Sequence, residues 1–298
     1  MRLATVATPD GTTRAVVSRS GSWHALEAAD LSELLSRPDW REAVASAATT
    51  PADAAPVAPL VLAADPDLAP DSEARLVNPL PRPGKVICCG LNYAEHITEM
   101  GRELPTFPTL FAKHADTLTG PADDLTLPAA LDVDWEAELA VVVGAPLRHA
   151  DEAQARAAIA GYTVANDISV RDWQQRTLQW FQGKAWDAST PVGPVVVTPD
   201  EIDPVAGLEL TCQVNGETLQ RGNTRTLVFS AAALLAYISE FTLLRPGDIV
   251  LTGTPGGVGM GMTPPRFLRD GDVVRTEIEG IGFLQNTFRT TRHREESS

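Results

Sequence analysis

The stretch 131–143, LDVDWEAELAVVV, alternates apolar or small residues with acidic ones, and it is the strongest constraint on the fold. Successive side chains of a β-strand point to opposite faces, so the alternation predicts a strand with a row of carboxylates on one face. These belong to Asp132, Asp134, Glu136 and Glu138. Neighbouring carboxylates repel one another unless water or a cation screens them. The stretch alone leaves two explanations open: an antiparallel strand with one acidic, solvated face, or a metal site.

The acidic face becomes apolar towards its end, where Ala140 and Val142 follow. We therefore expect Asp132 and Asp134 to lie towards solvent, and the two glutamates to lie where the strand enters the interior. Buried carboxylates rarely stay unpaired, so the glutamates are expected to have a partner.

The charge balance disfavours several classes of partner. Net charge is −15, from 24 basic and 39 acidic residues, and the sequence contains no stripe of Arg and Lys. Such a surface repels nucleic acid and anionic membranes. A small anionic substrate would need local positive groups or a bound cation. Only three lysines occur, Lys85, Lys113 and Lys184. Because the other basic residues are arginines, each lysine is a candidate for a specific role, unless codon bias explains the count.

Secretion and membrane insertion are not indicated. Charges and prolines interrupt every apolar run before it could span a bilayer, and the N-terminus lacks the apolar core of a signal peptide. Cys88, Cys89 and Cys212 have neither metal-binding nor redox spacing, so we expect reduced core residues. Together these features predict a cytoplasmic protein without a membrane partner.

The chain, at 298 residues, is long enough for one large domain and a small one. Residues 1–75 are predicted to form a small N-terminal α+β accessory domain. Residues 49–83 are rich in Ala, Pro and Asp, which predicts a linker. Residues 76–291 are predicted to form the main domain. The polar residues 292–298 are predicted to be a disordered tail.

The main domain is expected to be rich in strands. The strongest local signal is the pair of strands 208–214 and 217–221, which Asn215-Gly216 would join into a hairpin. Gln182-Gly183-Lys184 is expected to form a loop. Strands and helices do not alternate regularly, which argues against a Rossmann fold or a TIM barrel. The predicted class is mixed, β-rich α+β.

The individual chemical motifs are weak. The glycines at 253–261 do not fit a dinucleotide-binding or phosphate-binding loop, and the sequence has no nucleophile-elbow serine and no zinc-type cysteine spacing. His96 and Glu99 lie three residues apart on a short predicted helix. This pair is either a base with its orienting acceptor or a surface contact.

In combination, the motifs follow the order of the fumarylacetoacetate hydrolase superfamily, which residues 84–289 resemble. They are GLNYAEH at 90–96, DWEAELAVV at 134–142, GYTVANDISVRD at 161–172, QGK at 182–184 and TGTP at 252–255. Residues 1–75 resemble the small N-terminal domain of longer members. The resemblance implies a mixed β-sandwich roll and a homodimer.

The resemblance also implies a site. Family members bind Mg²⁺ or Mn²⁺ through three carboxylates, which correspond here to Glu136, Glu138 and Asp167. Ligands that are all oxygen suit such hard cations. Lys184 would contact the 2-oxo-acid head of a small anionic substrate, or the enolate formed from it. The other implied substrate contacts are Lys113, Arg171, Gln174 and Thr254.

The head group and metal do not fix the reaction. In hydrolytic members a His and a Glu on a lid helix activate water, and His96 and Glu99 match them. Our main prediction is a divalent-metal-dependent hydrolase that cleaves a C–C bond in acylpyruvate-like or fumarylpyruvate-like 1,3-dicarbonyl 2-oxo acids of aromatic catabolism.

Two alternatives remain open. The enzymatic one is a decarboxylase or isomerase of dicarboxylic 2-oxo acids, of the oxaloacetate decarboxylase or 2-hydroxyhepta-2,4-diene-1,7-dioate isomerase type. The other is a non-catalytic cation-binding protein, which the presence of both His96 and Glu99 disfavours.

Overall fold

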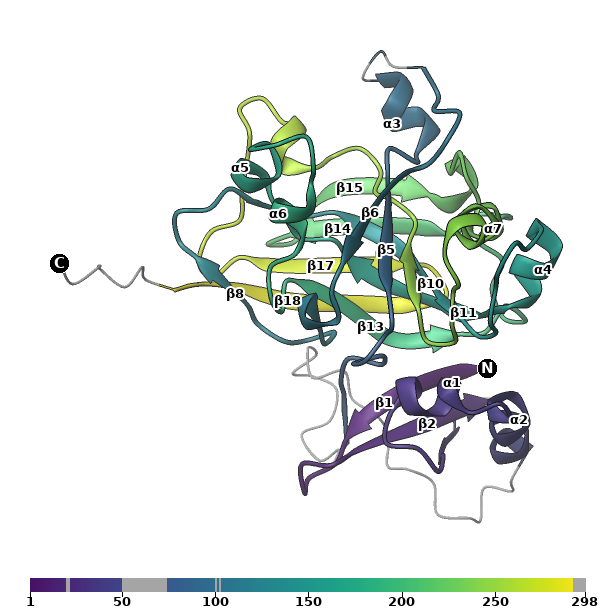
Figure 1. Ribbon diagram of the computed structural model, residues 1–298. Coiled ribbons are helices and arrows are strands. Elements are labelled where there is room, and N and C mark those ends of the chain that lie inside the picture. The colour runs from purple at the N-terminus through teal and green to yellow at the C-terminus, as the bar shows by residue number, and fades with distance from the viewer. Residues whose placement is uncertain (20–21, 50–73, 100, 102, 292–298) are drawn as a thin grey trace.

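The computed structural model describes residues 1–19, 22–49, 74–99, 101 and 103–291. Two β-sheets form the body of the molecule, and the helices are few and short (Figure 1). The mixed, β-rich α+β class is therefore confirmed. The predicted tail, 292–298, and most of the predicted linker lie outside the described residues.

The larger sheet is open and strongly mixed in chain order. Its main path runs through β3 (Ser22–Ala25), β2 (Thr13–Arg19), β1 (Arg2–Ala7), β13 (Thr190–Val197), β11 (Ile159–Asn166), β10 (Ala137–Val143), β16 (Ile249–Leu251), β5 (Val86–Gly90) and β6 (Thr109–Lys113). Off this path, β4 (Arg75–Leu76) pairs with β1, and β7 (Leu118–Thr119) pairs with β13. Most neighbours are antiparallel, but β16 and β5 are parallel.

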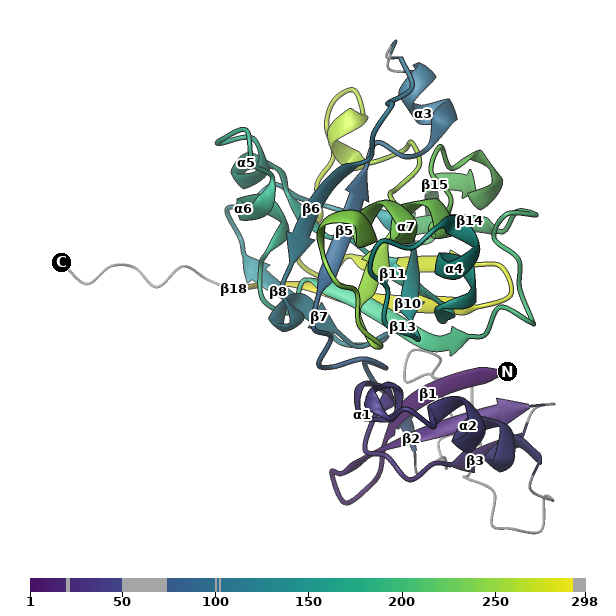
Figure 2. The ribbon, with the colours of Figure 1, turned by 45° about the vertical axis from the view of Figure 1, so that its right-hand side comes forward.

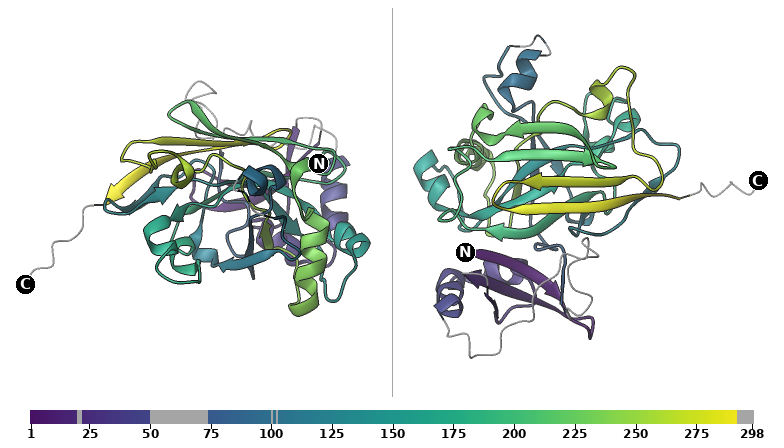
Figure 3. Two further views of the ribbon diagram at one scale, coloured as in Figure 1. Left: turned by 90° about the horizontal axis from the view of Figure 1, so that it is seen from above. Right: turned by 180° about the vertical axis from the view of Figure 1, so that it is seen from behind.

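A second sheet covers one face of the first. Its order is β15 (Glu217–Asn223), β14 (Glu209–Val214), β17 (Val273–Ile278), β18 (Gly282–Thr291) and β8 (Leu125–Pro128). The left view of Figure 3, in which the molecule is seen from above, shows the two layers. Strands β14, β17 and β18 of the second sheet contact β10, β11 and β13 of the first. The core between the layers includes Leu139, Val141, Val164, Leu210, Val274, Leu284 and Phe288.

The helices lie at the edges of this sandwich. They are α1 (Leu31–Ser36), α2 (Trp40–Thr49), α3 (Ala94–Glu99), α4 (Glu152–Ala157), α5 (Arg171–Gln174), α6 (Phe181–Lys184) and α7 (Ala231–Phe241), with 3₁₀ turns η1 (Ala115–Thr117), η2 (Thr224–Thr226) and η3 (Gly259–Gly261). Figure 2 shows α4 and α7 side by side at one end, where they contact each other.

The N-terminal strands extend the larger sheet. Leu3 of β1 lies opposite Val196 of β13. Leu3 also shares a buried cluster with Leu34 of α1 and with Val142 of β10. Figure 1 shows this part below the main body. The domain boundary at residue 75 stays a prediction.

The acidic stretch forms two strands instead of the single strand that the alternation predicts. β9 (Val133–Asp134) pairs with β12 (Ser169–Val170), whereas β10 pairs with β11 and β16. The chain changes partners at Trp135 and Glu136. The backbone N–H of Glu136 donates to the side-chain Oδ1 of Asn166 over 2.9 Å, and the fully buried Trp135 donates through Nε1 to the carbonyl of Gly257 over 3.1 Å.

The predicted hairpin is confirmed. β14 and β15 pair across Asn215 and Gly216, whose φ angles are 53° and 80°. Positive φ at both central residues matches the twist of the flanking strands, and Asn and Gly tolerate it best. This hairpin places β15 at the edge of the second sheet.

Candidate active site

Three carboxylates meet where β10 and β11 lie side by side. Glu136 directly precedes β10, Glu138 lies within it, and Asp167 directly follows β11. Ala137 pairs with Asn166, and the N–H of Asp167 donates to the carbonyl of Glu136 over 2.8 Å. One oxygen from each carboxylate lies within 4.8 Å of the others, and all three side chains are buried. This acidic triad could bind a divalent cation.

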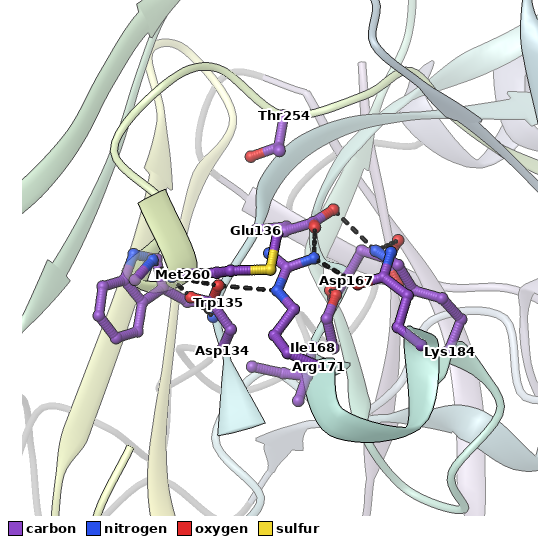
Figure 4. A network of polar contacts seen from close by, with 12 residues as sticks. Asp134, Trp135, Glu136, Asp167, Ile168, Arg171, Lys184, Thr254 and Met260 are labelled. Atoms are coloured by element: carbon purple, nitrogen blue, oxygen red, sulfur yellow. Dashed lines mark hydrogen bonds and ion pairs between the residues drawn. The ribbon is translucent and has the colours of Figure 1, made fainter. Parts of the chain in front are cut away.

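Two lysines neutralise part of the triad. Lys184 donates through Nζ to Glu136 Oε2 over 2.8 Å and to Asp167 Oδ2 over 2.7 Å (Figure 4). Lys113, at the end of β6, donates to the other oxygen of Asp167, Oδ1. Asp167 therefore receives an ammonium group at each of its two oxygens.

Glu138 is the least compensated member of the triad. It makes no ion pair within the part of the chain that the structure describes, and its Oε2 accepts from the N–H of Gly253 over 2.6 Å. Burial, reinforced by the charges of Asp167 and Glu136, raises the pKa of Glu138 well above its usual range. Burial alone would also raise the pKa of Asp167, but the two lysine ammonium groups outweigh it and hold that pKa below its usual range.

Lys184 lies in a helix, not in the predicted loop. α6 packs so closely against α5 that a Cβ on Gly183 would lie 2.6 Å from the Cα of Gln174. Glycine at this position therefore permits the packing that buries Lys184. Burial alone would lower the pKa of Lys184, but the charges of Asp167 and Glu136 raise it. The ammonium group stays protonated.

Asp134 is buried, so its predicted position towards solvent is wrong. Its carboxylate accepts from Arg171 Nε over 2.8 Å and from the backbone N–H groups of Gly259 and Met260 over 2.7 and 2.9 Å. A loop remote in sequence covers Asp134, which the alternation could not predict. Of the four acids in the stretch, only Asp132 is exposed, so the interpretation as a solvated acidic strand is also wrong.

Arg171 connects Asp134 with the triad. Its Nη1 lies 2.7 Å from Glu136 Oε1 and donates to Gln174 Oε1 over 2.8 Å. Burial alone would lower the pKa of Arg171, but the charges of Glu136 and Asp134 raise it. Its Nη2 is buried and meets no hydrogen-bond partner among the described residues. Its hydrogen-bonding capacity is therefore unused by the described part of the protein.

A cavity of about 720 Å³ opens beside the triad. Its charged and polar wall contains Glu136, Arg171, Gln174, Lys184 and Thr254. Its apolar wall contains Phe111, Trp180, Val258, Met260 and Met262. Apolar walls with a few converging polar groups are typical of small-molecule sites. The other implied site residues with described side chains, Lys113, Glu138 and Asp167, are not among those that line the cavity.

His96 and Glu99 both lie on α3, which projects from the top of the molecule in Figure 1. Their side chains lie outside the described part of the structure, so their role stays a prediction. Gly90 and Leu91, which precede α3 in the chain, line the cavity.

Gln220 of β15 is a site residue that the sequence did not reveal. Its Oε1 accepts from the N–H of Ala137, and its Nε2 donates to Thr254 Oγ1 and to the carbonyl of Pro255. No local pattern marks it, because it belongs to a hairpin far from the acidic stretch in sequence. Only the packing of the two sheets brings it to the site.

Residues 85–289 match the family model "Fumarylacetoacetate (FAA) hydrolase C-terminal". This range contains the triad, the two lysines and the cavity wall described above. The chain therefore belongs to the fumarylacetoacetate hydrolase family of enzymes.

Individual relatives cover most of the chain. It is 46% identical over 232 residues to the oxaloacetate tautomerase Fahd2a, mitochondrial, of Rattus norvegicus, over 77% of this chain and 74% of the relative. Fumarylacetoacetate hydrolase from psychrophilic Exiguobacterium antarcticum is 33% identical, with a TM-score of 0.80 over 98% of this chain and 100% of its own. The 5-carboxymethyl-2-hydroxymuconate delta-isomerase from Mycobacterium smegmatis is also 33% identical, with a TM-score of 0.74 over 98% of this chain and 99% of its own.

The remaining expectations concern membranes and cellular location. Among the described residues, no helix has the length and apolarity needed to cross a membrane. The cytoplasmic location stays a prediction, and the name of the rat relative places that protein in mitochondria.

Proposed function

We propose that this enzyme interconverts the enol and keto forms of dicarboxylic 2-oxo acids, with a divalent cation at Glu136, Glu138 and Asp167. The observation that carries this proposal is the position of the triad beside a cavity wall that contains Lys184 and Arg171, whose Nη2 has no hydrogen-bond partner among the described residues. Similarity to an oxaloacetate tautomerase and to a delta-isomerase supports it. The isomerase or decarboxylase alternative is therefore better supported than the C–C hydrolase of the main prediction.

The donor set suits Mg²⁺ or Mn²⁺. The three buried carboxylates offer oxygen ligands, which hard cations prefer. Glu138, whose carboxylate makes no ion pair with a described residue, would gain most from the added charge. When bound, the cation supplies positive charge that polarises the 2-oxo group and acidifies the neighbouring carbon.

The side chains of this chain supply the remaining functions. Tautomerisation moves a proton between the enol oxygen and the carbon next to the C–O carbon: in the keto direction the O–H bond breaks, a C–H bond forms and the double bond shifts to C=O, so negative charge develops on that oxygen in between. The protonated Lys184 can donate a hydrogen bond to it. Arg171 Nη2 and the Thr254 hydroxyl can donate to carboxylate groups of the substrate. Phe111 and Trp180 pack edge to face and form part of the apolar wall that would contact the substrate.

Lys113 and Gln174 have clear partners within the protein. Lys113 holds Asp167, and Gln174 accepts from Arg171. A direct contact of either side chain with substrate stays a prediction. A purely structural cation would need no such cavity wall, which supports an enzyme over a non-catalytic cation-binding protein.

The test follows the decay of enol absorbance after oxaloacetate is mixed with the protein and Mg²⁺ or Mn²⁺, with EDTA-treated protein as the control. Pyruvate formation and acetylpyruvate cleavage are measured on the same preparations. Metal-dependent acceleration of enol decay supports the proposal. Cleavage of acetylpyruvate without any effect on enol decay would instead assign the hydrolytic function.

We also expect a homodimer, as the resemblance implies. The net charge of −15 does not oppose this, because the centres of interfaces are depleted in charged residues. Sedimentation at micromolar protein concentration is the measurement, and a monomer would contradict the expectation.

A further inference from the structure

The side chain of Gln220 bridges the acidic triad and the loop that carries Thr254. Gln220 lies in β15 and is 1% exposed. Its Oε1 accepts over 2.9 Å from the N–H of Ala137, the residue between the two triad glutamates. Its Nε2 donates over 2.8 Å to Thr254 Oγ1 and over 3.0 Å to the carbonyl of Pro255. One buried amide thus joins three separate segments.

The backbone partners fix the orientation of this amide. The N–H of Ala137 can only donate, and the carbonyl of Pro255 can only accept. The oxygen of Gln220 must therefore face Ala137, and its NH₂ group must face Pro255 and Thr254. It follows that the Thr254 oxygen accepts this hydrogen bond, and its hydroxyl proton is left to donate elsewhere.

The hydroxyl of Thr254 lies beside the cavity. Thr254 lines the cavity wall, and in Figure 4 it lies above Glu136. Among the described residues its Oγ1 has Gln220 as its sole hydrogen-bond partner. A proton that finds no acceptor in the protein can be donated to a ligand.

The loop itself is held firmly against β15. A Cβ on Gly257 would lie 2.0 Å from the carbonyl oxygen of Leu219, and Trp135 donates to the carbonyl of Gly257. These contacts hold the loop in addition to the hydrogen bond from Gln220 to the carbonyl of Pro255. The distinct contribution of Gln220 is the direction of one hydroxyl proton.

We propose that Gln220 is a positioning residue, which directs the Thr254 hydroxyl proton into the cavity to donate to a carboxylate oxygen of the 2-oxo acid. The inference rests on the proposed function, because it takes the ligand to be a carboxylate. A hydrogen bond to a charged acceptor is among the stronger ones in proteins. Without Gln220 to direct the Thr254 hydroxyl proton, binding of the ligand should weaken by about ten-fold.

The test is calorimetric titration of oxalate, a planar mimic of the 2-oxo-acid head, into protein loaded with Mn²⁺. Gln220→Met and Thr254→Val should each weaken oxalate binding by about ten-fold. The double variant should lose no more than either single variant, because both changes remove the same hydrogen bond. Thr254→Ser keeps the hydroxyl and should restore the affinity of the unchanged protein. Manganese occupancy is measured first in every variant.

A matched control separates this role from a loss of stability. Asn286 is a buried amide that donates to the carbonyls of Gly120 and Asp123 over 3.1 and 2.8 Å and does not line the cavity. Asn286→Leu should lower the melting temperature while leaving oxalate affinity unchanged.

Oxalate affinity within about two-fold of the unchanged protein in Gln220→Met, or additive losses in the double variant, would overturn the inference. If Gln220→Met does not fold, Thr254→Val and Thr254→Ser carry the test. Oxalate affinity within about two-fold of the unchanged protein in Thr254→Val would again overturn the inference. Oxaloacetate turnover by the unchanged protein is scored separately, so failure of the proposed function would be recognised independently.

Discussion

Arg171 and Asp134 form a buried ion pair, with Nε and Oδ2 2.8 Å apart. Because the same carboxylate accepts from the N–H groups of Gly259 and Met260, it fixes both the guanidinium and a cavity loop. Removing Asp134 would leave Glu136 as the remaining charged partner of the buried guanidinium among the described residues.

Asp134→Asn should destabilise the protein by about 2–3 kcal/mol, the range for hydrogen bonds to charged groups, because Arg171 keeps Glu136 as a charged partner. Urea unfolding followed by circular dichroism measures the change. Asp132→Asn is the matched control, because Asp132 is the exposed acid two positions earlier, and it should change stability by less than about 0.5 kcal/mol. Equal effects in the two variants would contradict the assigned role of Asp134.

The members of the triad should behave differently in the absence of metal. Asp167→Asn removes the partner of two buried lysines and should lower the melting temperature of the metal-free protein. Glu138→Gln removes a carboxylate that makes no ion pair with a described residue, so the melting temperature should stay constant or rise.

Asp167→Asn, Glu138→Gln and Glu136→Gln should each weaken Mn²⁺ binding by at least about 10- to 100-fold. Substitution of residues that only support metal ligands already costs this much. The rise in melting temperature on adding Mn²⁺ should shrink accordingly. Unchanged Mn²⁺ affinity in all three variants would exclude the triad as the cation site.

Lys184 and His96 should differ in which reactions they affect. Lys184→Met removes a preorganised donor for the enolate oxygen and should slow tautomerisation, decarboxylation and any hydrolysis by about 10²- to 10³-fold. His96→Ala should abolish hydrolysis of acylpyruvates and leave tautomerisation largely intact, because only hydrolysis requires a water to be deprotonated.

The rates are compared at confirmed metal occupancy. Lys85→Met provides the control, since its ammonium lies 3.4 Å from Asp248 and does not line the cavity. Equal losses of all activities in His96→Ala would mean that the predicted dyad with Glu99 has a structural role.

The three cysteines should be unreactive in the folded protein. Burial raises the pKa of Cys89 and of Cys212 to about 12, and that of Cys88 well above its usual value. At pH 8 only about 10⁻⁴ of a thiol with this pKa is thiolate, the reactive form. A thiol-specific disulfide reagent should therefore label the native protein slowly and all three thiols after unfolding. Rapid labelling of Cys89, which lines the cavity, would contradict this.

The sequence predicted the acidic triad because its signals are local. The alternation of the strand placed Glu136 and Glu138 on one face, and the family motif added Asp167. The structure brings the three together although the strand breaks at Trp135, since the break precedes β10 and preserves the alternation within it.

The burial of each acidic side chain could not be predicted from the alternation. Alternation gives the face of a strand, whereas burial depends on what covers that face. Asp134 is covered by Gly259 and Met260, which no periodicity connects to it. Gln220 was missed for the same reason: its partners come from β10 and from the loop at Thr254. Such contacts emerge only from the pairing of strands across the whole chain.

The antiparallel register of β10 and β11 sets the spacing of the triad, with Glu138 opposite Ala165. Much of the cavity wall comes instead from α5, α6 and the loop 254–262, which contribute no member of the triad. Apart from Arg171 and Lys184, which pair with triad carboxylates, residues in those short segments can therefore be substituted without disturbing the distances between the carboxylates. In proteins that descend from such a chain, the sheet would conserve the metal-dependent chemistry. The 2-oxo acid that each protein accepts as substrate would change with the short segments of the cavity wall.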